Sequence, residues 1–374
     1  MENPFHFGSP AGGESFVDRD EELAGIVDRM LSGRHVILLS PRRYGKTSLL
    51  LEAVGRCKAR RGRGGYASLL MCSSQRDVAE TLLGAVLNGP LSWLSAQRQK
   101  LTQLLTQFRP NLRLELEPTG ALAVRLGAGM ADRDWRDAIA TALRLLGQAG
   151  EGKRSVCLVL DEFQRVAEID EALPAFFKTM ADELRDVSLV FAGSKMHVMQ
   201  RIATGPGAPL LGMGETFSLG LIPEDIMVPF LTRRARSAGK HMPLPVGRLI
   251  YEAVDGIPND VQRLAYDVFA QGGDRLDADE VEAAIKRLVS HRAVDYEESF
   301  VRLAPGQQRL LKALARQPRS SLYSRAFMDE IELANSTSVR RALDALEDLE
   351  QVAFRSGKWT VADAFYRRWL AGGR

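Results

Sequence analysis

Short apolar runs recur through the first 221 residues, and most of them alternate with stretches of helical spacing. In two of them, residues 156–160 and 187–192, apolar and polar residues do not alternate, which is typical of strands covered by helices on both faces of a parallel sheet. The runs span residues 35–40, 66–72, 156–160, 187–192 and 216–221. The helical stretches span residues 20–31, 47–58, 78–87 and 134–146. This order predicts an α/β domain with a parallel sheet over residues 1–221.

Residues 91–130 interrupt this pattern. A polar helical stretch at 91–108 leads to two segments, 112–116 and 121–126, in which hydrophobic and charged residues alternate. Glu117-Pro118-Thr119-Gly120 between them favours a turn, so we predict a β-hairpin. We interpret residues 91–130 as an insertion in the α/β domain.

After residue 221 the apolar runs stop and helical periodicity continues to about residue 294. Glycine-containing breaks divide this region at Gly239, Gly256-Ile257-Pro258 and Gly272-Gly273. We predict a helical lid over residues 222–295.

The last segment, residues 296–374, has a different order of elements. Three helical stretches come first, then two short strands, then a closing helix. They span residues 305–315, 324–333, 336–349, 351–354, 358–361 and 364–370. This order predicts a winged helix-turn-helix domain.

The composition adds little to this picture. The chain has 374 residues, 45% of them hydrophobic, and a mean hydropathy of -0.14, as in a globular protein of two or three domains. A net charge of +3 neither requires nor excludes a nucleic-acid partner. The three cysteines have no CxxC spacing, which argues against a disulfide framework or structural zinc. No stretch resembles a signal peptide or a membrane span, so we expect a cytoplasmic protein with no membrane partner.

Residues 40–47 carry the pattern of a phosphate-binding loop. They read Ser40-Pro41-Arg42-Arg43-Tyr44-Gly45-Lys46-Thr47, which is GxxxxGK[ST] except at the first position, and Ser48 follows. Backbone N–H groups of such a loop and the N-terminus of the next helix bind phosphate oxygens. Gly45 allows close approach of the backbone, Lys46 reaches the β- and γ-phosphates, and the Thr47 hydroxyl binds Mg²⁺.

The position of this loop, between a buried strand and an amphipathic helix, favours a nucleotide site over a helix that contains Gly-Lys-Thr by chance. Ser40 is the weakest match. Serine can form a tight turn with a side-chain hydrogen bond, but it disfavours the positive φ that glycine adopts freely.

The apolar run at 156–160 ends in two acidic residues, Asp161 and Glu162. A carboxylate at the carboxyl edge of a parallel strand points into the crevice where ligands bind. We predict that Asp161 holds Mg²⁺, directly or through water, and that Glu162 orients and deprotonates the attacking water. An ordinary acidic turn is the alternative, and the phosphate loop in the same chain favours the catalytic pair.

Together these motifs resemble the AAA+/STAND branch of P-loop ATPases, in particular the prokaryotic AAA-type ATPases with a C-terminal winged helix. The similarity covers most of the chain, including Asn3-Pro4-Phe5 and the form of residues 41–47. Residues 16–23 resemble the family's hhGRExE motif with Asp18 in place of glycine, which puts Arg19 near the adenine. The resemblance implies the sheet order 5-1-4-3-2, ATP and Mg²⁺ as cofactors, and homo-oligomerisation.

The resemblance also implies residues that sense the nucleotide. Ser194, after the run at 187–192, would sense the γ-phosphate, with a plain Gly-Ser turn as the alternative. Pro258 would pack on the adenine, and Arg263 would either reach the phosphates as a second sensor or lie solvated on its helix. Relatives often carry a Gly-Arg pair where this chain has Gly212-Met213, which predicts turnover that is slow or depends on a partner.

In the predicted winged helix, basic side chains lie on the third helix and on the wing. They are Arg340, Arg341, Arg355 and Lys358. In a DNA-binding domain these side chains would contact phosphates. Acidic residues between 344 and 350 would repel phosphates, so contact with a protein partner is the alternative.

These observations lead to one hypothesis and one rival. We expect Mg-ATP to bind between the α/β domain and the lid, with Lys46, Glu162 and Ser194 as the catalytic residues. Hydrolysis to ADP would then switch the lid and the winged helix between two arrangements. The rival is a nucleotide-stabilised protein- or DNA-binding module with little turnover.

Overall fold

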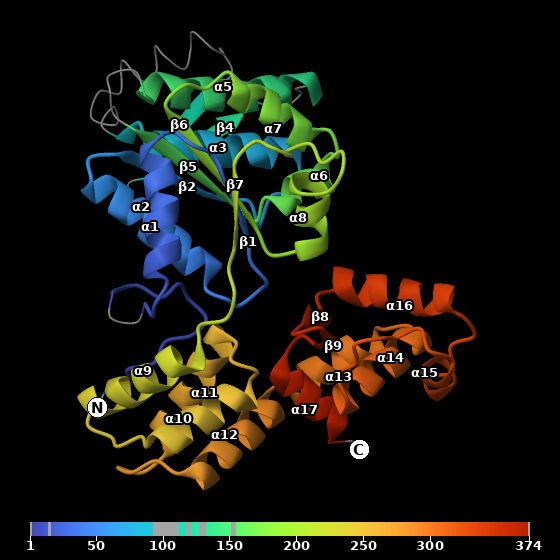
Figure 1. Ribbon diagram of the computed structural model, residues 1–374. Coiled ribbons are helices and arrows are strands. Elements are labelled where there is room, and N and C mark those ends of the chain that lie inside the picture. The colour runs from blue at the N-terminus through green and yellow to red at the C-terminus, as the bar shows by residue number, and fades with distance from the viewer. Residues whose placement is uncertain are drawn as a thin grey trace. The chain divides into compact units, whose positions relative to one another are not determined.

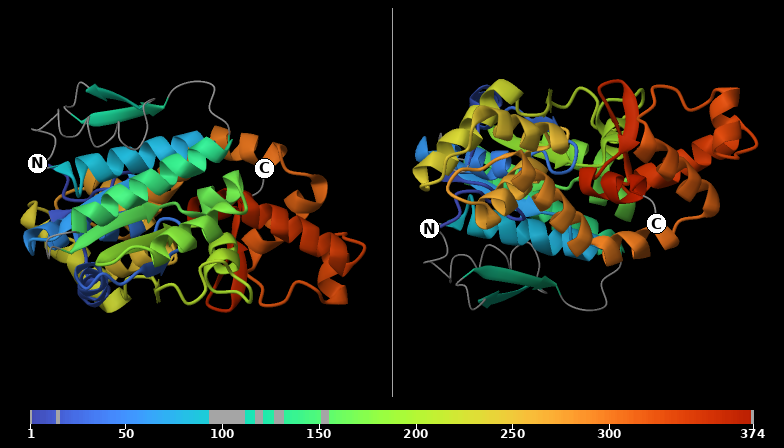
Figure 2. Two further views of the ribbon diagram at one scale, coloured as in Figure 1. Left: turned by 90° about the horizontal axis from the view of Figure 1, so that it is seen from above. Right: turned by 90° about the horizontal axis from the view of Figure 1, so that it is seen from below.

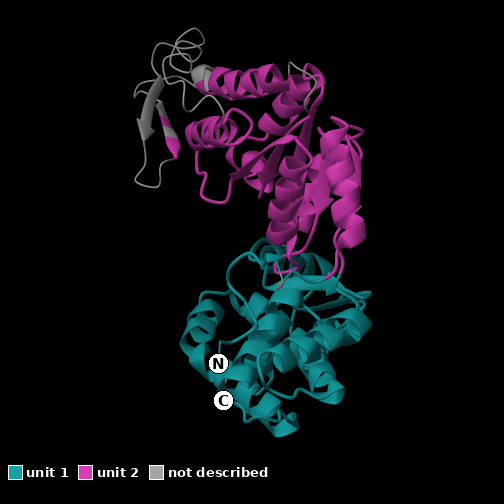
Figure 3. Ribbon diagram, turned by 90° about the vertical axis from the view of Figure 1, so that its left-hand side faces the viewer, with its two compact units in different colours: residues 1–17, 221–374 teal, residues 18–220 magenta. Residues whose placement is uncertain are grey.

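The computed structural model describes residues 2–13, 16–92, 112–116, 121–126, 132–150 and 155–372. The chain forms two compact units, coloured separately in Figure 3. Unit 1 contains Met1–Val17 and Leu221–Arg374, and unit 2 contains Asp18–Gly220. The first 17 residues, which we assigned to the α/β domain, thus pack within unit 1. Among the described helices, none has both the length and the apolar character that crossing a membrane requires.

Unit 2 is built on a five-stranded parallel sheet (Figure 1). Its strands are β1 (Val36–Leu39), β2 (Arg63–Ser68), β5 (Val156–Asp161), β6 (Val187–Gly193) and β7 (Glu215–Ser218). Their order is β2-β5-β6-β1-β7 and every pairing is parallel. This order confirms the predicted order 5-1-4-3-2. The carboxyl ends of β5, β6 and β1 therefore lie next to one another at one edge of the sheet.

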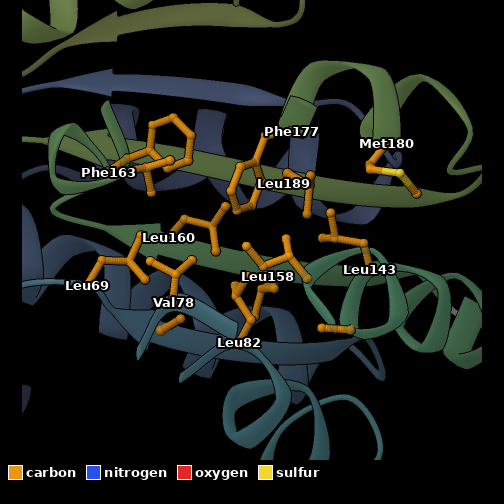
Figure 4. Close-up of a cluster of buried hydrophobic side chains, with 14 of the residues drawn as sticks. Leu69, Val78, Leu82, Leu143, Leu158, Leu160, Phe163, Phe177, Met180 and Leu189 are labelled. Atoms are coloured by element: carbon orange, nitrogen blue, oxygen red, sulfur yellow. The ribbon is translucent and has the colours of Figure 1, made fainter. Parts of the chain in front are cut away.

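Helices cover both faces of this sheet. α1 (Asp20–Leu31) and α2 (Lys46–Ala59) pack on one face. The other face is covered by α3 (Gln75–Asn88), α5 (Asp132–Gly150), α6 (Gln164–Ile169), α7 (Leu173–Asp182) and α8 (Met196–Ala203). Figure 4 shows this second layer, in which Leu82, Leu143 and Phe177 meet Leu158 and Leu160 of β5 in one continuous core. The sequence pattern had not assigned α6, α7 or α8.

The strand β2 begins and ends earlier than the predicted range of 66–72. Its first residues, Arg63-Gly64-Gly65, carry no apolar side chain and so left no hydrophobic signal, yet their backbone pairs with β5. Gly65 must be small, because a Cβ there would lie 2.8 Å from the Pro90 side chain. After Ser68 the chain leaves the sheet, and the side chain of Met71 is 87% exposed.

The alternating segments of the insertion form the predicted antiparallel hairpin, β3 (Leu112–Leu116) and β4 (Leu122–Leu126). Figure 2 shows the hairpin outside the sheet, next to α3. Asn88 at the end of α3 fixes it: the amide Nδ2 donates to the Leu122 carbonyl at 2.8 Å, and the Leu122 N–H donates to Asn88 Oδ1 at 2.9 Å. The predicted helix from residue 93 onward and the turn at 117–120 lie outside the described residues.

Unit 1 contains a helical region and a winged helix that share one hydrophobic core. The helical region comprises α9 (Glu224–Ser237), α10 (Leu244–Ala253), α11 (Pro258–Gln271), α12 (Ala278–His291) and α13 (Ala293–Val301). The winged helix comprises α14 (Pro305–Arg316), α15 (Arg325–Glu330), α16 (Ser336–Asp348), β8 (Val352–Arg355), β9 (Lys358–Val361) and α17 (Ala364–Ala371). The antiparallel pair β8–β9 is the predicted wing.

The helix α17 ties the winged helix to the helical region. Arg367 makes a two-pronged ion pair with Asp255, at 2.7 and 2.8 Å, and Arg292 pairs with Asp363 at 3.2 Å. The N-terminal arm joins the same unit, because Phe5 packs edge-on against Phe269 of α11. Unit 1 is therefore assembled from two segments that are distant in the sequence, the N-terminal arm and the part of the chain after residue 220.

Candidate functional site

The loop between β1 and α2 has the backbone of a phosphate-binding turn. Arg43 and Gly45 adopt positive φ, 71° and 88°, and Gly45 caps the N-terminus of the 14-residue helix α2. The first turn of α2 contains no acidic residue, so its own side chains do not oppose an anion at this helix end. Ser40 is buried and does not have positive φ, so serine fits the first position of the loop without backbone strain.

The carboxylate of Asp161, the last residue of β5, lies against the start of α2. Its Oδ1 is 2.6 Å from the Lys46 ammonium and accepts the backbone N–H of Glu162 at 2.9 Å. Its Oδ2 accepts hydrogen bonds from the Thr47 hydroxyl and the Tyr66 phenol, both at 2.8 Å. The Asp161 side chain is only 2% exposed, and these four donors offset the cost of burying its charge.

Glu162 follows in a left-handed conformation, with φ of 59°, which turns its side chain back toward the loop. Its Oε1 lies 2.6 Å from the Lys46 ammonium. Its Oε2 accepts hydrogen bonds from the Ser194 hydroxyl at 2.9 Å and from the Gln164 amide at 2.5 Å. Burial opposes ionisation, but Lys46 and these hydrogen bonds outweigh it and hold the pKa of Glu162 below its ordinary value. Glu162 is thus a carboxylate at neutral pH.

The structure therefore brings together five residues that the sequence singled out: Lys46, Thr47, Asp161, Glu162 and Ser194. They come from three neighbouring elements at one edge of the sheet, namely the loop after β1 and the ends of β5 and β6. The remaining residues of the loop and Ser48 lie in the same segment, at the start of α2.

Two further polar residues at this site, Tyr66 and Gln164, were missed in the sequence. Tyr66 lies in β2 opposite Val159, so its side chain is on the same face of the sheet as Asp161. Burial and the adjacent Asp161 carboxylate raise the pKa of Tyr66 well above its ordinary value, so the phenol remains a donor. Gln164 is three residues beyond Asp161, and Gly193 leaves the space for its side-chain amide.

Arg19 is buried in unit 2, and its guanidinium contacts a carboxylate and a carbonyl of the same unit. It pairs with Glu22 at 3.0 Å and donates to the Gly220 carbonyl at 2.5 Å. Asp18 and Arg19 both have positive φ, 51° and 80°. This conformation explains why the motif that residues 16–23 resemble has glycine at the position of Asp18.

The other two predicted nucleotide contacts, Pro258 and Arg263, belong to unit 1. Pro258 is the first residue of α11, and the preceding Gly256 has φ of 67° with the Tyr251 ring against it. The Arg263 guanidinium lies over two aromatic rings, 5.8 Å from the Phe7 centroid and 5.6 Å from the Phe365 centroid. Within the described residues no carboxylate pairs with it.

The basic residues of the winged helix are spread over two elements. Arg340 on α16 lies 3.7 Å from Asp344, and Arg341 is exposed on the same helix. On the wing, Arg355 donates to the Ala362 carbonyl at 3.0 Å and faces Lys358 across the two strands. Arg340 thus already has an acidic neighbour one helical turn away.

The donor atoms at Asp161 fit Mg²⁺ only in combination with a phosphate. Hydroxyl and carboxylate oxygens are the ligands that Mg²⁺ prefers, and Thr47 and Asp161 supply one of each. Across the described ranges, no group of three or more His, Cys, Asp or Glu side chains could hold a metal by itself. Because Mg²⁺ commonly binds one or two protein oxygens together with substrate phosphates, this set suits a metal that arrives with a nucleotide.

A parallel sheet in the order 5-1-4-3-2, a glycine–lysine loop after β1 and a C-terminal winged helix together define a P-loop ATPase fold. A family model described as "probable winged helix domain" matches residues 294–372. A comparison with curated protein sequences finds no match.

Solved structures with the same fold include the Walker-type ATPase PABY2304 of Pyrococcus abyssi. It has a TM-score of 0.67 and 18% identity, with 98% of this chain and 99% of that chain covered. The Aeropyrum pernix ORC2 protein, solved as ADPNP–ADP complexes, has a TM-score of 0.54, 16% identity and coverage of 96% and 94%. The Aeropyrum pernix ORC1 protein, solved in complex with DNA, has a TM-score of 0.53, 14% identity and the same coverage. At these identities the likeness establishes the fold.

Proposed function

We propose that this chain binds ATP with Mg²⁺ and hydrolyses it to ADP and phosphate, as a slow molecular switch of the AAA+/STAND type. One observation carries the proposal: a single ammonium group, Lys46, lies 2.6 Å from both Asp161 and Glu162, at the N-terminus of α2. The residues to which we assign the metal, the base and the phosphates are thus within one hydrogen-bond network.

Binding begins with the exchange of partners at Lys46. The loop N–H groups and the N-terminus of α2 attract the phosphates, and the Lys46 ammonium turns from the carboxylates to a phosphate oxygen. Thr47 and Asp161 would hold Mg²⁺, which neutralises charge on the phosphates. Asp161 keeps its position during this exchange, because Oδ2 is held by donors other than lysine.

Hydrolysis needs a base that is ionised at working pH and correctly oriented. Glu162 meets the first condition, since its pKa is lowered, and Ser194 and Gln164 meet the second by holding Oε2. Release of Lys46 toward the phosphates leaves Oε1 available to accept a proton from the attacking water. We assign Ser194 the further role of sensing the γ-phosphate, which its bond to Glu162 supports.

Phosphate release from the purified full-length protein tests this function. We expect Glu162→Gln to lower the rate by at least about 100-fold with Mg-ADP affinity unchanged, since general-base catalysis contributes 10²–10⁴-fold. Lys46→Ala should abolish nucleotide binding itself. Equally slow release by wild type and Glu162→Gln, with both binding ATP, would refute the enzymatic reading.

The rival function, a nucleotide-binding module with little turnover, is favoured by Met213. Where relatives often place an arginine, this side chain is partly buried and packs against the core of unit 2. An arginine that could act on a phosphate is therefore absent from that position. The rival predicts tight nucleotide binding without measurable phosphate release.

DNA would be the partner of that module if the winged helix binds phosphates, as the ORC1 structure in complex with DNA suggests by analogy. DNA affinity should then be measured at several salt concentrations, with and without ATP. Arg340→Ala should reduce the salt slope by about one if Arg340 contacts a phosphate. An unchanged slope would leave a protein partner as the better assignment, because Asp344 already lies near Arg340.

The proposal also includes a response of unit 1 to the nucleotide, with Pro258 on the adenine and Arg263 on a phosphate. The surroundings of Arg263 support this role, since two aromatic rings lie within about 6 Å of the guanidinium and no described carboxylate neutralises it. Size measurement in ATP, in ADP and without nucleotide tests whether copies of the chain associate. A size that is the same in all three conditions would exclude ATP-dependent oligomerisation.

A further inference from the structure

Tyr66 reaches the proposed metal site from a strand that carries none of the predicted site residues. β2 is the edge strand next to β5, and the phenol of Tyr66 donates to Asp161 Oδ2 at 2.8 Å. The Thr47 hydroxyl donates to the same oxygen at 2.8 Å. Oδ2 therefore has two donors that are independent of Lys46, whereas Oδ1 depends on Lys46 and one backbone N–H.

The difference between the donors to Oδ1 and those to Oδ2 matters when Lys46 leaves Asp161 to bind a nucleotide phosphate. The carboxylate then loses its only cationic partner, and its orientation depends on the Glu162 N–H at Oδ1 and on the two hydroxyl donors at Oδ2. Of the two hydroxyls, Thr47 is the weaker restraint, because its oxygen is also needed as a metal ligand. The phenol supplies a second donor to Oδ2 from the neighbouring strand β2, on a residue that we do not assign as a metal ligand.

We propose that Tyr66 is a positioning residue for Mg²⁺: its hydroxyl holds the Asp161 carboxylate in the orientation in which it would bind the metal once Lys46 has moved to the phosphates. This inference rests on the proposed Mg-nucleotide function. In this proposal Tyr66 acts through Asp161 and binds neither nucleotide nor metal itself. Its contribution should therefore appear in the metal-dependent part of nucleotide binding and nowhere else.

A purely structural role is the competing explanation, in which the phenol simply satisfies its hydrogen bond on the nearest acceptor. The two explanations predict different measurements. A structural role lowers the melting temperature and affects nucleotide binding with or without metal alike. A positioning role weakens nucleotide binding only when Mg²⁺ is present, because the orientation of Asp161 matters only for binding the metal.

The test is calorimetric binding of ADP in the presence of Mg²⁺ and, separately, in EDTA, with Tyr66→Phe in the full-length chain. We expect the Mg-ADP affinity to fall by about tenfold, the scale seen when a partner of a metal ligand is removed. The affinity in EDTA should stay at the wild-type value. Phenylalanine retains the ring, so packing against β5 is preserved.

Two companion variants sharpen the test. In an Asp161→Asn background, Tyr66→Phe should have no further effect on metal dependence, because both changes act on the same carboxylate. Ser188→Ala is the matched control: it removes a side-chain hydroxyl bond, Ser188 to the Arg34 carbonyl at 2.5 Å, at the opposite end of the sheet. It should leave both affinities unchanged.

The possible failures can be told apart. If wild type binds no ADP in either condition, the proposed function fails. If wild type binds with a metal dependence that Asp161→Asn removes, but Tyr66→Phe equals wild type, only the role of Tyr66 is refuted. Equal losses in Mg²⁺ and in EDTA, or losses that add to those of Asp161→Asn, would show a structural role and overturn the inference as well.

Discussion

Replacing Lys46 with methionine tests the electrostatics of the site through stability, without any nucleotide. Methionine keeps the length and the apolar stem of lysine, so the main change is loss of the ammonium group. That group lies 2.6 Å from one oxygen each of Asp161 and Glu162, and the Lys46 side chain is 6% exposed. Removing one partner of a buried ion pair costs about 3–5 kcal/mol. Since Glu162 is partly exposed and screened by solvent, we expect the lower end, about 3 kcal/mol.

This loss should depend on pH in a defined direction. In the wild type the folded-state pKa of Glu162 is lowered, so the group contributes stability above its ordinary pKa of 4.5, and this contribution disappears as pH falls through the folded value. Without Lys46 the opposing effect of burial remains, and the carboxylate destabilises the fold at neutral pH. The difference between wild type and Lys46→Met is therefore largest at neutral pH and shrinks as pH approaches 4.5.

The assay is calorimetric unfolding of the full-length protein in EDTA, with attention to the transition of unit 2. For a unit of this size, a loss of about 3 kcal/mol lowers the melting temperature by roughly 6–12 °C. The double variant Lys46→Met/Glu162→Gln should recover more than half of the loss, because Asp161 keeps three other donors. A variant as stable as wild type at neutral pH, or a loss that does not shrink on acidification, would refute the reasoning.

Three further changes test the fold around the site. Gly193→Ala places a Cβ less than 3.0 Å from the Gln164 amide, so we expect a loss of about 1–3 kcal/mol in denaturant unfolding and slower phosphate release. Arg367→Ala removes the two-pronged pair with Asp255 and should lower the stability of unit 1 by about 1–2 kcal/mol, with little recovery in Arg367→Lys. Leu158→Ala, in the centre of the sheet, should cost about 2–5 kcal/mol; a loss under 1 kcal/mol would contradict the packing described here.

The elements with a strong repeating pattern were predictable from sequence. β5 and β6 are nearly unbroken apolar strands, and hydrophobic residues recur at every second position in the sequence of the hairpin β3–β4. β2 was misplaced because two glycines in its first half give no hydrophobic signal, although the backbone of β5 holds them in the sheet. The sheet order was predicted from the family resemblance, because the local sequence pattern does not determine which strands pair.

The sequence allowed site residues to be predicted only where polar or charged residues directly follow an apolar strand. Asp161 and Glu162 follow an apolar run directly, and the loop before Thr47 has a fixed spacing. Tyr66 could not be identified in this way, because its role depends on β2 being the neighbour of β5, which is a property of the whole sheet. The sequence also left Arg263 undecided between a sensor and a solvated arginine, and its two ring contacts come from Phe7 and Phe365, far away in the chain.

The organisation of unit 1 changes the form of the proposed switch. The hypothesis from sequence was that hydrolysis switches the helical lid and the winged helix between two arrangements, without saying whether they move separately or together. The helical region and the winged helix share one buried core, however. In addition, α17 contacts residues before and after Pro258 in the sequence, through the Arg367–Asp255 ion pair and the Phe365–Arg263 contact. Separating them would expose apolar surface at about 25 cal/mol per Å² as well as breaking these contacts. A nucleotide signal that reaches Arg263 should therefore move the helical region and the winged helix together, as one body.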